Sequence, residues 1–399
     1  MTPQQPEQAG LTRRGLFLGG AAGLGAAAAV GIDRALSAPA GEAEHGSAVE
    51  PFYGTHQSGI ATRPQAFASF YSFDLLPDVD RDGLRKLMVI LTDDAARLTQ
   101  GRPALADSEP ELALIPARLT ITFGFGPGFV RRADADAVPA WLAPLPAFTI
   151  DDLDPAWNDG DLLIQVAADD PVTVSHAARM LLKDTRSFAT LRWLQTGFRR
   201  AAGSKPANAT MRNLFGQLDG TVNPEPGTAE FDSVVWSDEG WLRGGTSLVL
   251  RRIRMDLETW DQLDRPGREQ SIGRTQDTGA PLTGGEEHDE PDFEAVNAVG
   301  FPIIADYAHI RRARSDNPEE KIFRRPYNYD DAPPSSTVSN AGQIFASFQA
   351  RVDRQYVPLQ KRLDELDLLN EWTVPIGSAV FAIPPGCSEG GFIGDTLLA

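Results

Sequence analysis

The chain has 399 residues, of which 42% are hydrophobic and 23% charged, and its formal net charge is −18. This composition is typical of a globular protein and excludes a fibrous or disordered chain. The excess of acidic residues disfavours binding to nucleic acid or to an anionic membrane, and the lone cysteine, Cys387, excludes an intrachain disulfide.

The first 38 residues are typical of an export signal. Thr12–Leu18 contains two adjacent arginines and resembles the twin-arginine consensus, and a run of Gly, Ala and Leu follows it to Val30. Because this run is only weakly apolar, we expect cleavage rather than a stable membrane span, with a retained anchor as the alternative. Loss of residues 1–38 removes three arginines and two acids, which gives the mature chain a net charge of −19. Residues 39–60 are expected to form an extended arm.

Hydrophobic periodicity predicts interleaved strands and helices in the first half of the mature chain. Asp170 and Pro171 are suited to the N-cap and first turn of a helix, and the glycine-rich segment 124–128 is suited to a turn after a strand. The expected elements are strands at 67–73, 119–123, 162–166 and 191–195 and helices at 79–98 and 171–184.

The second half has a similar order of expected strands and helices. Its expected elements are strands at 247–254, 343–348 and 379–383 and helices at 256–263 and 351–363. The order lacks the strict alternation of a parallel doubly wound sheet. We therefore predict an α+β fold of two related halves with antiparallel sheets, divided near residues 220–235. No internal identity is strong enough to establish a duplication.

Two segments hold the residues best suited to chemistry. Residues 216–224 place Asp219 in a turn bounded by glycines, and residues 308–312 place His309 fifteen positions before Arg324. A histidine ligand, a carboxylate and a guanidinium are the parts that a haem peroxidase needs. Each is weak alone, because Asp-Gly is a common turn and a histidine after an apolar stretch is usually a core residue.

Together these segments resemble the dye-decolourising peroxidase family. In that family a GxxDG motif supplies a distal aspartate, a histidine in an AHIR context binds haem iron, and an arginine in an RRxY context completes the distal side. The resemblance extends to residues 50–59 and 377–385 and so covers nearly all of the chain beyond residue 50. These flanking stretches resemble the secreted, twin-arginine-exported branch that includes deferrochelatase/peroxidases. The family usually continues AHIRxANPR, whereas here Arg314-Ser-Asp-Asn-Pro-Glu stands at its end, so no role is carried over for the trailing arginine.

The resemblance implies two ferredoxin-like modules, at 61–225 and 226–399, with one haem b per chain bound mainly by the C-terminal module. It implies that His309 is the proximal iron ligand. Asp219 would transfer the proton of peroxide, and Arg324 would stabilise charge on the departing oxygen. Arg325 is the alternative to Arg324.

Three further residues are expected at the cofactor. The resemblance implies that Asp367 accepts the other ring N–H of His309 and raises its basicity, and Asp364 is the nearest competitor. Arg311, in the basic stretch suited to haem propionates, and Phe381 complete this set.

The other histidines are expected to be structural or solvent-exposed. His56 is expected to form a structural hydrogen bond, and His176 to face solvent because it lies off the apolar stripe of its helix. His288 lies in an acidic run that is more typical of a solvated loop than of a cation site, and His45 lies in the arm.

The function implied by the resemblance is that of a haem peroxidase that oxidises bulky aromatic or phenolic donors, such as dyes, with hydrogen peroxide by one-electron steps. The implied partners are peroxide, small aromatic donors and the twin-arginine export machinery, at a periplasmic or extracellular location. No nucleic acid and no stable membrane insertion after cleavage are expected, and the oligomeric state stays open, a homo-oligomer included. The alternatives are release of iron from haem, as a deferrochelatase, and a non-enzymatic haem carrier. Residues considered as electron relays are Trp241, Trp260, Tyr327, Tyr329 and Trp372.

Overall fold

The computed structural model describes residues 45–334 and 336–399. The expected export signal at 1–38 and the first residues of the expected arm lie outside the described residues. Gly46–Ala399 form one structural unit, to which everything below refers. In the described ranges no helix is both long enough and apolar enough to cross a membrane.

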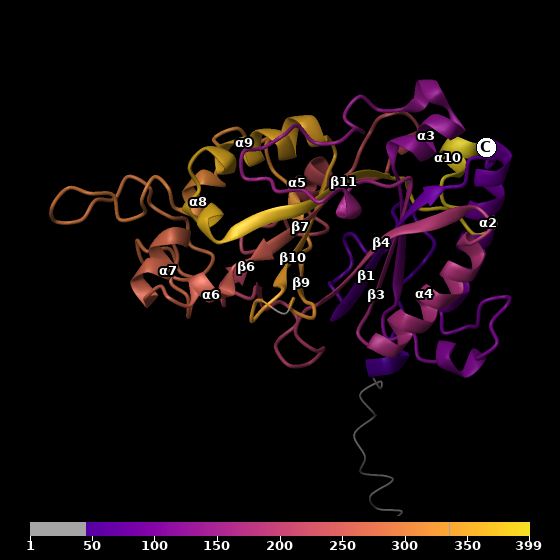
Figure 1. Cartoon of the computed structure of the whole chain (residues 1–399), viewed down its shortest axis with the longest axis horizontal. Coiled ribbons are helices and arrows are strands. Elements are labelled where there is room, and N and C mark those ends of the chain that lie inside the picture. Colours follow the sequence, from indigo (N-terminus) through magenta and orange to yellow (C-terminus); the bar gives the residue numbers. More distant parts are fainter. Residues whose placement is uncertain (1–44, 335) are drawn as a thin grey trace, which may run out of the picture. The chain divides into compact units, whose positions relative to one another are not determined.

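The first half of this unit is a four-stranded antiparallel sheet with the spatial order β2-β3-β1-β4. Helices α2 and α4 connect its strands and pack against each other on one face of the sheet (Figure 1). The chain order strand-helix-strand-strand-helix-strand with this spatial order is the ferredoxin-like arrangement. The elements are β1 (Phe67–Leu75), α2 (Arg81–Leu98), β2 (Thr120–Phe125), β3 (Leu162–Ala168), α4 (Pro171–Thr185) and β4 (Ala189–Phe198).

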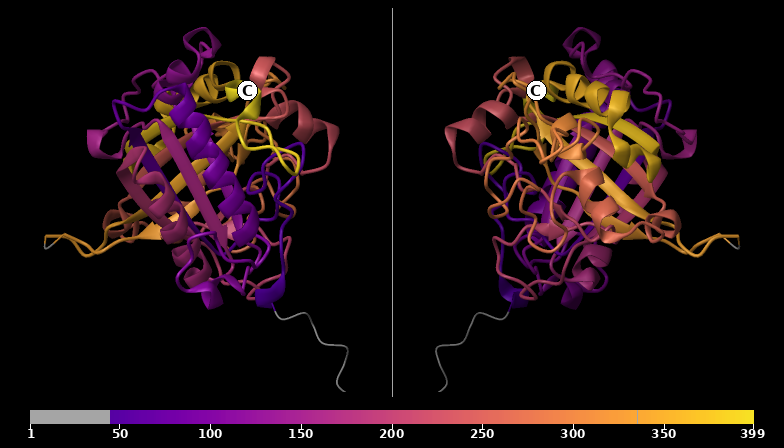
Figure 2. Two further views of the ribbon diagram at one scale, coloured as in Figure 1. Left: turned by 90° about the vertical axis from the view of Figure 1, so that its right-hand side faces the viewer. Right: turned by 90° about the vertical axis from the view of Figure 1, so that its left-hand side faces the viewer.

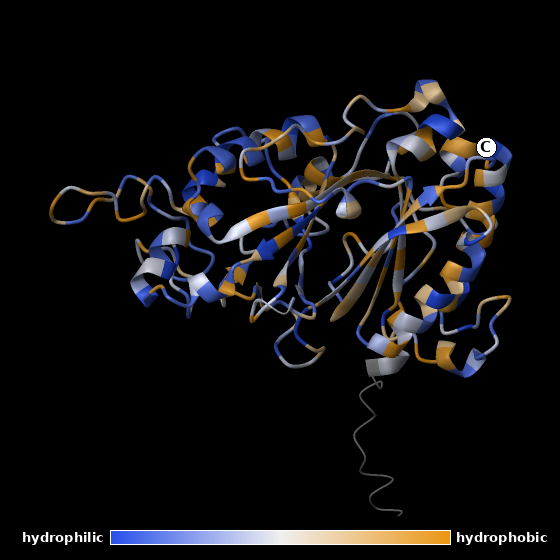
Figure 3. Ribbon diagram, in the orientation of Figure 1, coloured by the Kyte–Doolittle hydropathy of each residue, from blue (hydrophilic) through white to orange (hydrophobic). Residues whose placement is uncertain are grey.

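Local sequence determines where these helices begin. Asp80 caps α2, since its side chain accepts a hydrogen bond from Gly83 N over 2.9 Å. Asp170 caps α4 in the same way through Thr173 N at 2.8 Å, and Pro171 occupies the first turn. The apolar faces of both helices point to the sheet (Figure 3), where residues such as Leu87 are fully buried. The predicted strands and helices of this half are therefore confirmed to within a few residues.

The second half repeats the arrangement. Its sheet has the order β11-β7-β10-β9, which matches that of the first half strand for strand. The elements are β7 (Thr246–Met255), α6 (Leu257–Trp260), α7 (Arg265–Ile272), β9 (Tyr327–Asp330), β10 (Ala341–Gln349), a π-helix (Val352–Tyr356) that continues into α9 (Val357–Leu366), and β11 (Thr373–Ile383). The predicted α+β fold with two related antiparallel halves is confirmed.

The two sheets join edge to edge. β11 meets β2 through the pair Ala382–Phe125, and β4 meets β9 through Phe198–Asn328. With the pairing of β7 and β10, these two junctions close the strands into a ring. Large buried side chains from both halves, among them Phe70 and Phe381, form one cluster there. A second and larger cluster lies under α2 and α4. The left view of Figure 2 shows these helices in front of the sheet.

Several short elements that periodicity does not predict complete the second half. They are β5 (Met211–Arg212), β6 (Leu218–Asp219), α5 (Ala229–Val235), α8 (His309–Arg312), β8 (Phe323–Arg324) and the 3₁₀ turns Gly240–Leu242 and Leu368–Glu371. Two more short helices, α3 (Pro127–Ala133) and α10 (Asp395–Leu398), pack near α2. All three residues of the expected catalytic centre lie on these short elements.

The expected solvent exposure of His176 is wrong. Its side chain is buried, and Nε2 lies 2.9 Å from Oδ2 of Asp107. The reason is tertiary: the loop after α2 covers this side of α4 and brings a buried acid to the histidine. The structural hydrogen bond of His56 is confirmed, because Nδ1 lies 2.6 Å from Gly244 O and the ring stacks on Trp236.

The described part of the expected arm is packed rather than free. Gln57 is buried, and its Nε2 donates to Phe123 O and Pro384 O at 3.0 and 2.9 Å. Phe52 and Ile60 are also buried. This segment therefore contacts both halves of the ring.

Candidate functional site

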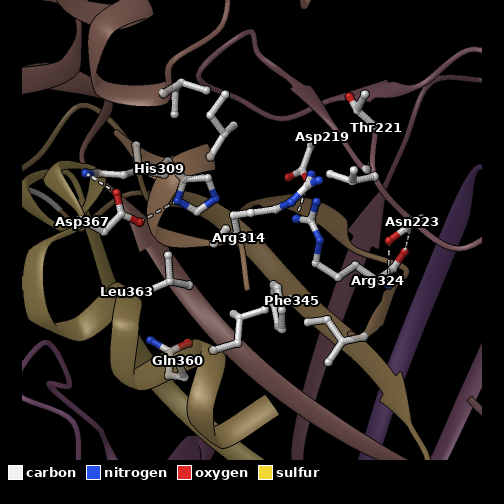
Figure 4. Close-up of a pocket in the computed structure, with 18 of the residues that line it drawn as sticks. Asp219, Thr221, Asn223, His309, Arg314, Arg324, Phe345, Gln360, Leu363 and Asp367 are labelled. Atoms are coloured by element: carbon white, nitrogen blue, oxygen red, sulfur yellow. Dashed lines mark hydrogen bonds and ion pairs between the residues drawn. The ribbon is translucent and has the colours of Figure 1, made fainter. Parts of the chain in front are cut away.

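A cavity of about 710 Å³ opens in the second half of the unit. Its walls come from the β5–β6 turn, strands β7, β8 and β10, and helices α8 and α9 (Figure 4). The lining combines apolar side chains with acidic, basic and amide groups. The residues used below are Asp219, Asn223, Arg314, Arg324, His309, Gln343, Phe345, Leu363 and Asp367.

A short hairpin presents Asp219 to the cavity. Asp219 ends β6 and pairs with Met211 of β5. Gly216 and Gly220 adopt φ angles of 83° and 118°, a region that favours glycine. A Cβ at Gly216 would also lie only 2.8 Å from Nε2 of Gln276. The glycine-bounded turn seen in the sequence is therefore required by the backbone here.

Asn223 ties this turn to β8. Its Nδ2 donates to Arg324 O over 2.6 Å, and its Oδ1 accepts from Arg324 N over 3.0 Å. The side-chain amide thus imitates a strand partner for the backbone of Arg324. This double contact fixes the position of the turn relative to the arginine.

Asp219 and Arg324 form one hydrogen-bonded unit. Nη1 of Arg324 donates to Oδ1 of Asp219 over 2.7 Å, and Nε2 of Gln343 donates to Oδ2 over 2.7 Å. Burial alone would raise the pKa of Asp219, but the charge of Arg324, the hydrogen bond from Gln343 and the charge of His309 lower it below its usual value. The carboxylate is therefore ionised and able to accept a proton.

His309 begins α8 on the other side of the cavity from this unit (Figure 4). Its Nδ1 lies 2.5 Å from Oδ2 of the buried Asp367. Oδ1 of Asp367 accepts from Leu369 N over 3.0 Å, so the carboxylate is held at both oxygens. Burial lowers the pKa of His309, but the charge and hydrogen bond of Asp367 outweigh it and raise the pKa overall.

These residues fit a haem. With Nδ1 bound to a carboxylate, Nε2 is the nitrogen open to the cavity, and a carboxylate partner makes an imidazole a stronger iron ligand. The His309 side chain is 29% exposed and faces the cavity. Apolar walls such as Phe345 and Leu363 suit a porphyrin face. The acid–arginine unit faces the histidine across this space.

The structure separates the alternatives that the sequence left open. Arg325, next to Arg324, is 1% exposed and donates to Thr62 O and to Oε1 of Gln65, away from the cavity. Asp364 accepts from Oγ1 of Thr149 and from Ile150 N at 2.8 and 3.0 Å. Arg324 and Asp367 are thus the residues that reach the site.

Two residues expected at the cofactor lie elsewhere. Arg311 is two positions after His309 on the short helix α8, which turns its side chain to Phe293 O at 2.6 Å and Asp306 at 3.2 Å. Phe381 is buried inside the ring of strands. An irregularity between Pro375 and Gly377 in β11 shifts the register, so Pro375 faces the cavity and Phe381 does not.

Sequence reasoning missed Gln343 and the placement of Arg314. Gln343 lies in the buried strand β10, two residues before Phe345 and on the same face, so a polar residue within a strand expected to be buried was the available signal. Arg314 extends into the cavity and pairs with Glu290 at its wall (Figure 4). It belongs to the stretch that departs from the family pattern.

Among the residues considered as relays, Tyr327 and Tyr329 are fully buried inside the ring. The rings of Trp260 and Trp372 meet edge to face at 5.2 Å. Nε1 of Trp241 donates to Ala137 O over 2.9 Å. None of the five lines the cavity within the described ranges.

Comparisons with known proteins agree with this geometry. A dye-decolorizing peroxidase of Thermobifida fusca (strain YX) is 36% identical over 433 residues, covering 100% of both chains. A deferrochelatase of Escherichia coli (strain K12) is 34% identical over 373 residues, covering 88% of this chain and 87% of that protein. The crystal structure of a DyP-type peroxidase from Cellulomonas bogoriensis matches with a TM-score of 0.87 and 52% identity, over 89% of this chain and 99% of that one.

Sequence models of two peroxidase domains also match. Residues 57–199 match the description "Dyp-type peroxidase, N-terminal", and residues 210–388 match "Dyp-type peroxidase, C-terminal". The chain therefore belongs to the Dyp-type peroxidase family and is a haem-dependent peroxidase.

Proposed function

We propose that the protein uses hydrogen peroxide to oxidise bulky aromatic or phenolic donors, such as dyes, by one-electron steps. The observation that supports this most strongly is the Asp219–Arg324 unit opposite His309. When bound, one haem b per chain supplies an iron centre that takes two oxidising equivalents from peroxide and passes them to donors one electron at a time.

The proximal residues would hold the iron and orient the ligand ring. Nε2 of His309 would hold the iron, and Asp367 keeps the ring in the tautomer that leaves this nitrogen free. Because Leu369 N fixes Oδ1 of Asp367, the carboxylate stays in place, and rotation of the ring would break its hydrogen bond to Oδ2. The ligand is thus preorganised for its cofactor.

The distal residues move a proton and stabilise charge. The ionised Asp219 takes the proton from the inner oxygen of peroxide and returns it to the outer oxygen as the O–O bond breaks. Arg324, 2.7 Å from that carboxylate, stabilises the negative charge that develops on the departing oxygen. Both steps gain from the low exposure of the Asp219 side chain, since a poorly solvated site strengthens electrostatic interactions.

Replacement of Asp219 tests this mechanism. Asp219→Asn should slow the reaction with peroxide by about 10²–10⁴-fold in stopped-flow measurements, the usual contribution of a general acid–base group. Asp364→Asn is the matched control, because it removes a carboxylate near the proximal side that accepts hydrogen bonds from Thr149 and Ile150. An Asp219→Asn protein with the wild-type rate would refute the mechanism.

We also propose export by the twin-arginine pathway and a periplasmic or extracellular location. The support is the pair Arg13–Arg14, the weakly apolar run after it and the cleavage region before residue 39. The mature charge of −19 favours cationic over anionic donors. Replacing both arginines with lysine should leave the protein in the cytoplasm on cell fractionation; unchanged export would argue against this pathway.

The resemblance to deferrochelatase supports a second candidate function, release of iron from haem with the porphyrin left intact. Incubation with haem and extraction of the pigment separates the two functions. Metal-free protoporphyrin would support iron release. Recovery of haem alone, together with dye oxidation, would support the peroxidase.

A further inference from the structure

Gln343 makes the second hydrogen bond to Asp219. It is the third residue of β10, its side chain is 5% exposed, and it lines the cavity. Nε2 donates to Oδ2 of Asp219 over 2.7 Å, while Arg324 donates to Oδ1. Among the described residues no other hydrogen bond of the Gln343 side chain is formed, so its Oε1 is not committed to another donor.

The backbone around Gln343 is more firmly held than that around its partners. In β10 it pairs with Ile253 of β7 on one side and with Asn328 of β9 on the other. Asp219 and Arg324 instead end two-residue strands. The strand pairing therefore holds Gln343 in place, and its side chain orients the Asp219 carboxylate.

We propose that Gln343 is a positioning residue that directs the proton to Oδ2 of Asp219 and reverses its own hydrogen bond when that proton arrives. This inference rests on the proposed function of Asp219. With Asp219 ionised, Nε2–H of Gln343 donates to Oδ2, as the structure shows. After Oδ2 takes a proton from peroxide, a half-turn of the amide brings Oε1 to accept from the new O–H group.

The chemistry of the two neighbours decides which oxygen is protonated. A guanidinium has only donors, whereas a carboxamide has both a donor and an acceptor. Arg324 thus cannot accept a hydrogen bond from a proton on Oδ1, but Gln343 can accept one from Oδ2. No proton is gained or lost by the glutamine, and the same proton leaves Oδ2 for the outer peroxide oxygen.

The charged groups around Asp219 oppose its protonation. Arg324 on β8 favours the ionised form, and Arg199, the residue after β4, is also within electrostatic reach of it. His309 on α8 adds no charge when its Nε2 holds the iron. The two arginines keep their sign when the proton arrives. Gln343 is neutral and alone can change from donor to acceptor, so it is the residue that adapts to both states of the carboxyl group.

The test is an infrared pH titration of the haem-loaded protein, with the band of protonated Asp219 identified by its loss in Asp219→Asn. In Gln343→Leu the donor is lost, and Asp219 should titrate about one to two pH units higher, as expected for one hydrogen bond to a charged group. The pH at which the rate of the peroxide reaction falls on the acid side should rise by the same amount. Gln343→Glu should raise the pKa of Asp219 further, because two adjacent carboxyl groups share one proton.

Gln165→Leu is the matched control. Gln165 is also a buried strand residue, and its Nε2 makes one hydrogen bond, to Gly59 O at 3.2 Å, in the other half of the ring. It should lower the unfolding temperature but leave the Asp219 titration unchanged. If Gln343→Leu does not fold, Gln343→Asn serves, since its shorter side chain keeps the amide but withdraws it from Oδ2.

The outcomes distinguish the two proposals. The role of Gln343 would be overturned if the Gln343 variant that folds shows the wild-type pKa of Asp219 and the wild-type rate profile at acid pH. A loss of rate in Asp219→Asn would then still support the peroxidase mechanism. A wild-type rate in Asp219→Asn would instead refute the mechanism itself. A shift in Gln343→Leu equal to that in Gln165→Leu would show a structural effect only and would also overturn the inference.

Discussion

Nη1 of Arg324 lies 2.7 Å from Oδ1 of Asp219, although 105 positions separate the two residues in the chain. The proton-transfer group and the cation of the site are therefore one unit. Asn223 reinforces it, because the same side chain belongs to the turn of Asp219 and binds the backbone of Arg324. A change at either residue will thus affect the other.

The two adjacent arginines should respond differently to the same substitution. Arg324→Leu should slow the reaction with peroxide by roughly 10²–10³-fold, the usual cost of removing a group that stabilises developing charge. Arg325→Leu should retain the chemistry but lose stability of about 1–3 kcal/mol for each buried acceptor left without its donor, namely Ile60 O and Oε1 of Gln65. Stopped-flow rates and denaturant unfolding measure the two effects, and the reverse pattern would contradict the assignment.

Asp367→Asn should weaken haem retention. The amide cannot accept from Nδ1–H of His309 with the strength of a carboxylate, so the ligand loses basicity and orientation, and affinity should fall about 10–100-fold. Transfer of haem to an excess of apomyoglobin measures the dissociation rate. Asp364→Asn is again the control, and equal haem loss in both variants would show that the contact between His309 and Asp367 is not important for binding.

Dye oxidation should be favoured by acid. Arg324 and Gln343 hold the pKa of Asp219 low against the effect of burial, so the ionised form persists as pH falls and is lost only below the usual aspartate range. We expect an optimum below about pH 6, and a profile that peaks above about pH 8 would argue against Asp219.

Most of the framework could be predicted from the sequence. Periodicity located β1, α2, β3, α4, β7 and β10 to within a few residues, because these elements are long and have one buried face. It located only the second half of β11. It could not locate β5, β6, β8 or α8, which have two to four residues and are formed by tertiary contacts such as the Asn223 clamp.

The site itself came from motif resemblance rather than from periodicity. His309, Asp219, Arg324 and Asp367 lie together as expected, since each is part of a motif. Arg311 and Phe381 do not, because the turn of α8 and the irregularity in β11 point them away. Burial of His176 depends on a loop that packs over its helix through Asp107, a contact that no local pattern contains.

Stability should depend on pH through a carboxyl pair between α2 and α4. Burial, together with the neighbouring Asp94, raises the pKa of Asp184 to about 7, and Oδ2 of Asp184 is buried without a donor. Because the folded state holds this proton more tightly than the unfolded state, its stabilising effect is complete at acid pH and is lost as pH rises toward about 7.

Asp184→Asn removes this dependence. The variant should unfold at a higher temperature than the wild type at about pH 8, with a smaller difference or none at about pH 4, because the amide is neutral throughout. Calorimetry at the two pH values measures this. An equal change at both values would show that the pair does not titrate in this range.

The most direct test of the central claim, that His309 holds the haem opposite Asp219 and Arg324, is a visible spectrum. The purified mature protein is recorded before and after one equivalent of peroxide, beside His309→Ala. We predict a haem band in the wild type that changes with peroxide and that is lost or strongly altered in the variant. Identical spectra and an identical response in both proteins, or a wild type that cannot be loaded with haem, would contradict the claim.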